Sequence, residues 1–121
     1  MKNQVGLIGL LVLGLFIAGC GGGSSPDHTP PAGMGSIMVN NNTGDDILVY
    51  IDGIATSSHA SYADITPYDL TPGSHRVTLT ESRGWRNYSG FVDVLQGRLT
   101  YLDVSDDLKN IYAYDVATFY N

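Results

Sequence analysis

The chain has 121 residues, of which 43% are hydrophobic and 15% charged, and it contains one cysteine. This length allows one modest globular domain, and a single cysteine excludes an intramolecular disulfide, so the core alone must stabilise the fold. The formal net charge is −6, and once Lys2 is set aside five basic groups face twelve acidic ones. Such a surface repels phosphate groups, which disfavours nucleic acid and anionic lipid headgroups as direct electrostatic partners.

The first predicted element is the uncharged run VGLIGLLVLGLFIA, from Val5 to Ala18. Its about fourteen residues match the apolar region of a secretory signal, whereas a membrane-spanning helix needs about twenty. The run leads into Ile17-Ala18-Gly19-Cys20, and this order of a branched aliphatic residue, two small residues and cysteine resembles the lipobox of bacterial lipoproteins. The resemblance implies that residues 1–19 are a signal peptide and that Cys20 becomes a diacylglyceryl cysteine at the mature N-terminus.

Two other interpretations of this segment stay open. It is an uncleaved membrane anchor if the uncharged stretch, which extends through Gly23, spans the bilayer, or an ordinary signal peptide if Cys20 is incidental. The lone cysteine directly after two small residues favours lipidation, and two or three acyl chains such as palmitate anchor a protein stably. Gly21 rather than aspartate follows Cys20, which favours the outer membrane where the host has one. We therefore expect a lipid-anchored protein of the cell envelope.

Residues 20–35 are rich in glycine, serine and proline, and we expect a flexible tether with a span on the order of 20 Å. His28 lies in this stretch and is interpreted as a solvated linker residue. The globular domain is expected to cover residues 36–121.

From Ser36 onward apolar residues recur with a period of two, and glycine or proline interrupts the chain roughly every ten residues. No window has a helical period. The predicted strands are SIMVN, DDILVYIDG, ITPYDL, HRVTLTE, FVDVL, RLTYLDV and IYAYDVATFY. We predict an all-β fold: a small single-domain antiparallel β-sandwich of about seven strands.

Three details of this prediction can be tested. The strand over residues 47–51 is apolar on both faces, which is typical of a central strand, and HRVTLTE places His75, Val77 and Leu79 on one face. A hairpin across Gln96-Gly97 is expected to join FVDVL to RLTYLDV. The last strand is expected to pack its aromatic residues, and as an exposed edge it can instead pair with a partner protein; these aromatic residues are Tyr112, Tyr114, Phe119 and Tyr120.

Several stretches resemble known families. VYIDG (49–53), LTPGSHRVTL (70–79) followed by Gly84-Trp85, and VDVLQGRLTYLDV (92–104) resemble a PEGA-type domain, a small β-sandwich of bacterial surface proteins and lipoproteins. The same residues resemble an extracellular sandwich family of unknown function, which IATSSHASYADITPYDL fits better. Both resemblances imply a sandwich fold, and neither brings catalytic residues.

Motifs of enzymes and of metal sites are missing from the sequence. No hydrolase elbow, zinc-protease helix, redox cysteine pair or phosphate-binding glycine loop is present, and His59 and His75 lie on separate elements. The acidic clusters Asp45-Asp46 and 103–107 lack the alternating ligand spacing of a calcium loop, so solvated turn residues are favoured over a Ca²⁺ site. We expect a non-enzymatic protein without cofactor or metal.

The remaining candidate site is aromatic. Trp85 lies between Arg83 and Arg86, with Tyr88 close by, on a predicted connection. Exposed rings can stack on sugars while arginines bind hydroxyl or carboxylate groups; the alternative, which we favour here, is that Trp85 closes the end of the core. The leading hypothesis is thus a membrane-anchored lipoprotein that presents a non-catalytic β-sandwich as a structural or protein-interaction module. The second hypothesis is a glycan- or ligand-binding surface module that uses these four residues.

Overall fold

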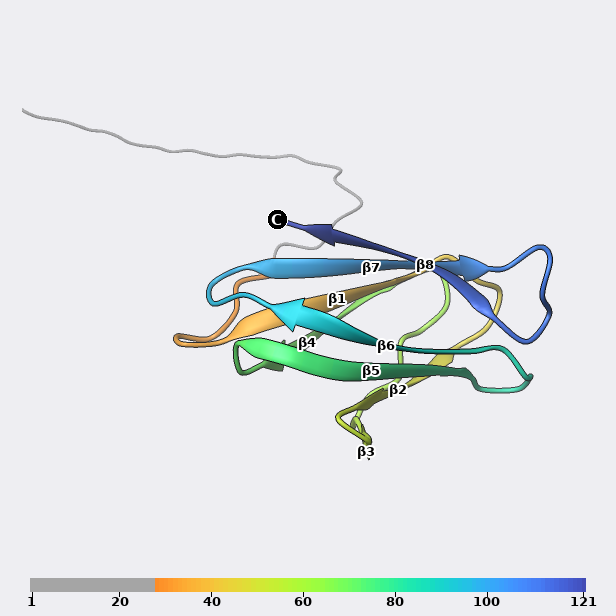
Figure 1. Ribbon diagram of the computed structural model, residues 1–121, viewed down its shortest axis with the longest axis horizontal. Helices are drawn as coiled ribbons and strands as arrows, with labels where there is room; N and C mark the ends of the chain where they lie inside the picture. The colour runs from red at the N-terminus through yellow and green to blue at the C-terminus, as the bar shows by residue number, and fades with distance from the viewer. Residues whose placement is uncertain (1–27) are drawn as a thin grey trace, which may run out of the picture.

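The computed structural model describes residues 28–121, which fold into two packed β-sheets (Figure 1). The predicted signal peptide, Cys20 and the first part of the predicted tether lie outside the described residues. Residues 28–121 form eight strands: β1 (Gly35–Asn41), β2 (Ile47–Ile51), β3 (Ile54–Ala55), β4 (Ile65–Leu70), β5 (Gly73–Glu81), β6 (Asn87–Val94), β7 (Leu99–Asp106) and β8 (Tyr114–Tyr120).

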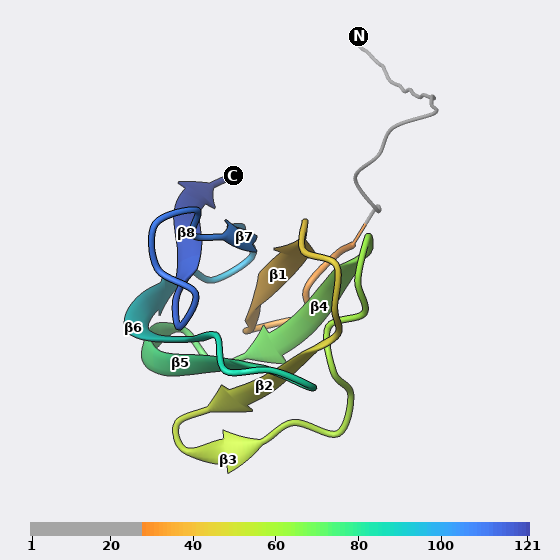
Figure 2. The ribbon, with the colours of Figure 1, turned by 90° about the vertical axis from the view of Figure 1, so that its right-hand side faces the viewer.

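The two sheets have four strands each, in the orders β4-β1-β7-β8 and β3-β2-β5-β6 (Figure 2). Neighbouring strands are antiparallel except β1 and β7, which run parallel. The predicted all-β sandwich is confirmed, with one strand more than expected. The extra strand is β3, a two-residue strand that follows a tight turn in which both Asp52 (φ 53°) and Gly53 (φ 82°) are left-handed, as such two-residue hairpin turns require.

The core lies between the sheets, and strands such as β2, β5 and β7 contribute alternate residues to it. In β2 the buried residues are Ile47, Val49 and Ile51, and in β5 they are Val77 and Leu79, as the period of two predicts. The other apolar side chains of this core cluster come from every remaining strand except β3, and from Ala60: Ile37, Val39, Tyr68, Val92, Val94, Leu102, Val104 and Tyr114. β2 lies inside its sheet as expected.

The predicted hairpin across Gln96-Gly97 is wrong. β6 pairs with β5 in one sheet, and β7 pairs with β1 and β8 in the other, so the connection between them crosses from sheet to sheet. The parallel contact with β1 occupies the side of β7 that a hairpin partner needs. Within β6, Val92 and Val94 face the core, whereas Phe91 points outward and is 71% exposed.

The two ends of the sandwich differ in what reaches them. One end, which we call the tip, holds the β5–β6 connection (residues 82–86) and the β7–β8 connection (residues 107–113). The opposite end, the base, holds the start of β1 and the β6–β7 connection, where the Gly97 amide donates to the Met34 carbonyl at 2.8 Å. His28 also lies near the base, where Nε2 is 2.7 Å from a carboxylate oxygen of Asp69 on β4. His28 is therefore bound to the domain, and its interpretation as a solvated linker residue is wrong.

Candidate functional site

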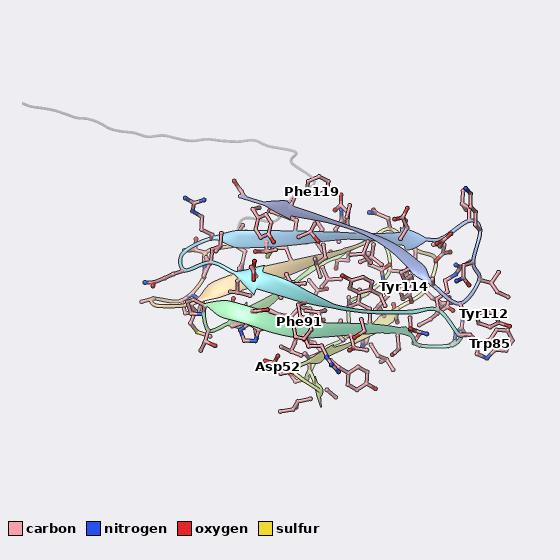
Figure 3. The ribbon with its side chains drawn as sticks, viewed as in Figure 1. Asp52, Trp85, Phe91, Tyr112, Tyr114 and Phe119 are labelled. Atoms are coloured by element: carbon pink, nitrogen blue, oxygen red, sulfur yellow. The ribbon has the colours of Figure 1, made fainter. Side chains whose placement is uncertain are left out.

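The tip carries four large apolar side chains that face solvent. Trp85 is 73% exposed, Leu108 is 97% exposed, and Ile111 and Tyr112 are each 58% exposed. The rings of Trp85 and Tyr112 pack against each other with centroids 6.3 Å apart and planes tilted by 46°, and both project from the end of the sandwich (Figure 3). We call these four residues the apolar tip. Four exposed apolar side chains of this size on two neighbouring connections are uncommon on a protein that works alone, because water solvates them poorly.

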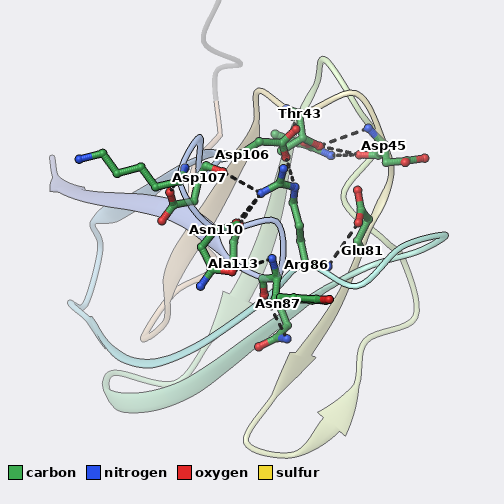
Figure 4. A network of polar contacts seen from close by, with 12 residues as sticks. Thr43, Asp45, Glu81, Arg86, Asn87, Asp106, Asp107, Asn110 and Ala113 are labelled. Atoms are coloured by element: carbon green, nitrogen blue, oxygen red, sulfur yellow. Dashed lines mark hydrogen bonds and ion pairs between the residues drawn. The ribbon is translucent and has the colours of Figure 1, made fainter.

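Arg86 holds the β7–β8 connection in place. Its guanidinium Nη1 lies 3.0, 2.9 and 2.9 Å from the carbonyl oxygens of Asp107, Asn110 and Ala113 (Figure 4). Nε lies 3.3 Å from a carboxylate oxygen of Asp106, and the Arg86 side chain is only 16% exposed. One cation thus binds the carbonyl groups of a whole loop, and charged hydrogen bonds of this kind are stronger than neutral ones.

Backbone contacts join the same two connections. The Asn87 amide donates to the Tyr112 carbonyl at 3.2 Å, and Asn87 and Ala113 form an isolated parallel bridge. The backbone amide of Arg86 donates to a Glu81 carboxylate oxygen at 3.3 Å. These contacts order the backbone that carries the apolar tip, so the tip is preorganised.

A buried polar network shapes the neighbouring β1–β2 connection. Asn41 is fully buried; its amide nitrogen donates to the carbonyls of Asp45 at 2.8 Å and Ala60 at 3.0 Å. Its carbonyl oxygen accepts from the amide and the hydroxyl of Thr43, at 2.9 and 2.6 Å. All the side-chain donors and acceptors named here are paired, which is what makes a buried polar residue tolerable.

Tyr114 lies in the core on β8, and its hydroxyl is buried without a hydrogen-bond partner among residues 28–121. Burial, followed by the nearby carboxylates of Glu81 and Asp106, raises the pKa of this hydroxyl far above its usual value. The phenol is therefore neutral and serves the core through its ring. An unpaired buried hydroxyl has an energetic cost that the ring packing must exceed.

The predicted aromatic site is only partly assembled. Trp85 is 73% exposed and lies at the end of the sandwich (Figure 3), so the interpretation that it closes the core is wrong. Arg83 is also available, with its side chain 83% exposed and Nε 3.6 Å from Asp45. Arg86 is used by the loop carbonyls, and Tyr88 is half-buried against the core. The structure thus brings Trp85 and Arg83 to the surface and uses the other two residues internally.

Sequence reasoning missed the partners of Trp85. Residues 111–120 were predicted to form a single closing strand with packed aromatic residues. Instead β8 begins at Tyr114, and only Tyr114 among those aromatic residues is buried. Tyr112, Phe119 and Tyr120 are 58, 53 and 54% exposed, so their predicted packing is wrong. The signal that can separate Tyr112 from the strand is the turn sequence Asp107–Asn110 before it, where two side-chain-to-backbone bonds close successive turns.

The histidines and acidic residues lie in separate pairs. His59 Nε2 is 3.4 Å from Asp46, and His75 Nδ1 is 2.6 Å from Asp52, with its Nε2 2.7 Å from the Thr71 carbonyl oxygen. Within residues 28–121 no group of three or more histidine, cysteine or acidic side chains is placed to hold a metal ion. Nor do these residues include a helix long and apolar enough to cross a membrane.

No protein-family model matches the chain, and a comparison with curated proteins finds no match. The resemblance to PEGA-type domains and to the lipobox therefore stays a prediction from the residues alone.

Proposed function

We propose that this protein is a lipid-anchored, non-catalytic module of the bacterial cell envelope that binds a partner protein through its apolar tip. The observation that carries the proposal is a loop whose backbone is fixed while its large apolar side chains are exposed. Arg86, which is nearly buried, binds the loop, and the side chains of Leu108, Ile111 and Tyr112 face solvent. A rigid apolar surface loses little entropy on binding and gains from desolvation. Aromatic and aliphatic side chains together suit the centre of a protein interface.

The place of the tether supports an outward-facing tip. Residue 28 contacts Asp69 near the base, and β1 starts at the base and ends toward the tip. If acyl chains on Cys20 hold the chain to a membrane, the point of attachment lies nearer the base. The tip then faces away from the lipid, toward other components of the envelope.

The anchor is tested on the full chain by metabolic labelling with a palmitate analogue and by mass spectrometry of the mature N-terminus. We expect label on the wild-type protein and none on Cys20→Ser, together with a mature chain that begins at residue 20. A mature chain that begins elsewhere, or carries no lipid, overturns the anchor while leaving the tip proposal testable.

The tip is tested by photo-crosslinking in cells. A photoreactive phenylalanine analogue replaces Tyr112 in one version of the full chain and Phe91, equally aromatic and 71% exposed on the other sheet, in a matched control. We expect one discrete protein adduct at position 112, absent at position 91 and lost when Trp85→Ser and Ile111→Ser are added. No adduct, or the same adduct at both positions, overturns a protein-binding tip.

A glycan is the second candidate ligand, because Trp85 and Arg83, two positions apart in the chain, are both exposed and Trp85 packs at a tilt against Tyr112. A hollow of about 630 Å³ next to Leu108 is lined by carboxylates that can accept hydroxyl groups, from Asp106, Asp107 and Asp115. Trp85 is the only tryptophan of the chain, so fluorescence reports on the environment of this side chain at the apolar tip. Protection from acrylamide quenching by envelope polysaccharide favours the glycan, and unchanged quenching favours the protein partner.

A further inference from the structure

The two sheets have four edge strands, and three of them have features that hinder pairing with a further strand. β3 is only two residues long, and β4 carries Pro67, which has no amide proton to offer to a neighbour. β6 has Gly90 in its middle, which weakens a strand for pairing. β8 has seven residues, Tyr114–Tyr120, without proline, glycine or lysine. It is the one long edge in the described residues that lacks these protective features.

The outward backbone groups of β8 follow from its pairing with β7. At one end of the pair of strands, the Asn121 amide donates to the Leu99 carbonyl at 2.9 Å. At the other end, the Asp107 amide donates to the Ala113 carbonyl at 3.4 Å. In an antiparallel ladder these pairs alternate, so odd-numbered residues of β8 bond to β7. The amide and carbonyl groups of Val116, Thr118 and Tyr120 therefore point away from the sheet, and among residues 28–121 β8 pairs with β7 only.

We propose that this edge pairs with β8 of a second copy of the chain, antiparallel and with the two-fold axis at Thr118. The β4-β1-β7-β8 sheets of the two copies then form one continuous eight-stranded sheet across the dimer. The inference is independent of what the apolar tip binds, because the tip and the β8 edge use different residues.

The sequence of β8 is complementary to itself in this register. Thr118 faces Thr118, Val116 faces Tyr120, and Ala117 faces Phe119. Threonine pairs and pairs of a β-branched with an aromatic residue are among the favourable cross-strand contacts. The only charged side chain of β8, Asp115, faces the Asn121 amide side chain, so no like-charged side chains meet. A strand from an unrelated protein has no such built-in match.

The exposed side chains of β8 gain contacts from this pairing. Tyr120 is 54% exposed although it shares the core-facing side of the strand with buried Tyr114, because β6 and β8 are bridged only at their starts, through Asn87 and Ala113. Phe119, on the opposite side, is 53% exposed. Pairing with a second β8 places an apolar neighbour beside each of these rings.

The first test is a disulfide across the axis. In the full chain carrying Cys20→Ser, Thr118→Cys places two thiols opposite each other, at the Cα separation of about 5.5 Å that a disulfide accepts. We expect a covalent dimer on a non-reducing gel after mild oxidation. The matched control is Thr66→Cys on β4, the opposite edge of the same sheet, which is expected to stay monomeric. Equal dimer from both variants, or none from Thr118→Cys, overturns the proposal.

The second test uses charge and checks the register. Thr118→Lys and Thr118→Glu each place like charges on the axis, so each variant alone is expected to lose at least tenfold in dimer affinity by sedimentation, with an unchanged circular dichroism spectrum. Mixing the two variants is expected to restore the dimer as a heterodimer. Failure of the mixture to pair while both variants are folded overturns the two-fold at residue 118, and a wild-type chain that sediments as a monomer at all concentrations overturns self-pairing altogether.

Discussion

The tip and the base of the sandwich both hold connecting segments against the strands, but they do so through different side-chain contacts. At the tip, the guanidinium of Arg86 binds three loop carbonyls, and guanidinium groups are not deprotonated in proteins. At the base, histidine–aspartate contacts of 2.6 and 2.7 Å tie turns and the incoming chain to strands, through His75–Asp52 and His28–Asp69. The tip is held chiefly by the guanidinium of Arg86, and the base by contacts between histidine and aspartate side chains.

The difference extends to what each end shows to solvent. The base brings the N-terminal segment close to the strands through His28, whereas the tip largely buries the guanidinium of Arg86 and leaves large apolar side chains such as Trp85 and Leu108 in solvent. A loop that only closes a sandwich has no need of this inverted arrangement. The comparison supports the proposal that the tip binds a partner and that the base lies nearer the point of attachment.

The largest expected effect comes from removing the tip cation. Arg86→Ala leaves the carbonyls of residues 107, 110 and 113 without their donor, and we expect a loss of about 3 kcal/mol in the free energy of unfolding. Urea denaturation followed by circular dichroism measures it. The control is Arg76→Ala, whose guanidinium lies 5.7 Å from the ring centre of exposed Phe91, with a loss below about 1 kcal/mol. If Arg86→Ala and Arg76→Ala lower the free energy of unfolding equally, the hydrogen bonds from Arg86 to the loop carbonyls do not stabilise the tip.

A glycine substitution tests close packing at the base. A Cβ at Gly35 meets the Leu95 carbonyl oxygen and lies 2.7 Å from a Val94 methyl carbon, whereas a Cβ at Gly44, on the tip side, meets nothing within 4 Å. We expect Gly35→Ala to lower the free energy of unfolding by about 2 kcal/mol. Gly44→Ala is expected to change it by less than about 0.5 kcal/mol. Thermal unfolding of both variants checks this, and a neutral Gly35→Ala shows that the β6–β7 connection can move away.

The fold was largely predictable because it depends on local patterns. The period of two placed Val77 and Leu79 in the core, and such a period is a property of a few neighbouring residues. The hairpin across Gln96-Gly97 failed because strand partners are chosen by the whole fold. Nothing in FVDVLQGRLTYLDV encodes that β1 runs parallel to β7 and takes the place of β6.

The candidate site was less predictable, for a related reason. Trp85 was found as a candidate, but its exposure depends on where the β5–β6 connection ends relative to the core. The role of Arg86 depends on carbonyl groups that lie 21 to 27 residues further along the chain, and carbonyls have no sequence signature. Tyr112 was assigned to the strand because one aromatic residue after another reads as continuous β-structure. Long-range contacts of this kind become visible only with the structure.

Two tyrosine hydroxyls offer a smaller, signed test inside the core. The Tyr68 hydroxyl donates to the Ser58 carbonyl at 2.8 Å, and burial raises the pKa of Tyr68 to about 12. Tyr68→Phe is expected to lower the free energy of unfolding by about 1 kcal/mol. Tyr114→Phe removes a buried hydroxyl that has no partner among the described residues, and it is expected to leave stability unchanged or raise it by up to about 1 kcal/mol. Two losses of equal size, by urea denaturation, contradict the assignment of Tyr114 as unpaired.

The smallest expected effect is a pH dependence confined to the base. Burial opposes protonation of His75, but its bonds to the Asp52 carboxylate and the Thr71 carbonyl outweigh burial and raise the pKa of His75 above 6.5. The bond from His75, and then the amide of Arg76, lower the pKa of Asp52 below 3.8. The histidine contribution is complete below pH 6.5 and is lost as pH rises through the raised value; the aspartate contribution is complete above pH 3.8 and is lost as pH falls through the lowered value. The difference in urea midpoint between the wild type and His75→Gln is therefore expected to be largest between these limits and to shrink on both sides. His59→Gln at the tip, where the contact to Asp46 is 3.4 Å and half exposed, is the control and is expected to leave the midpoint unchanged throughout. If the difference in urea midpoint for His75→Gln does not change from pH 3 to pH 9, the His75–Asp52 contact does not make stability depend on pH. The base end of the sandwich then does not differ from the tip in this respect.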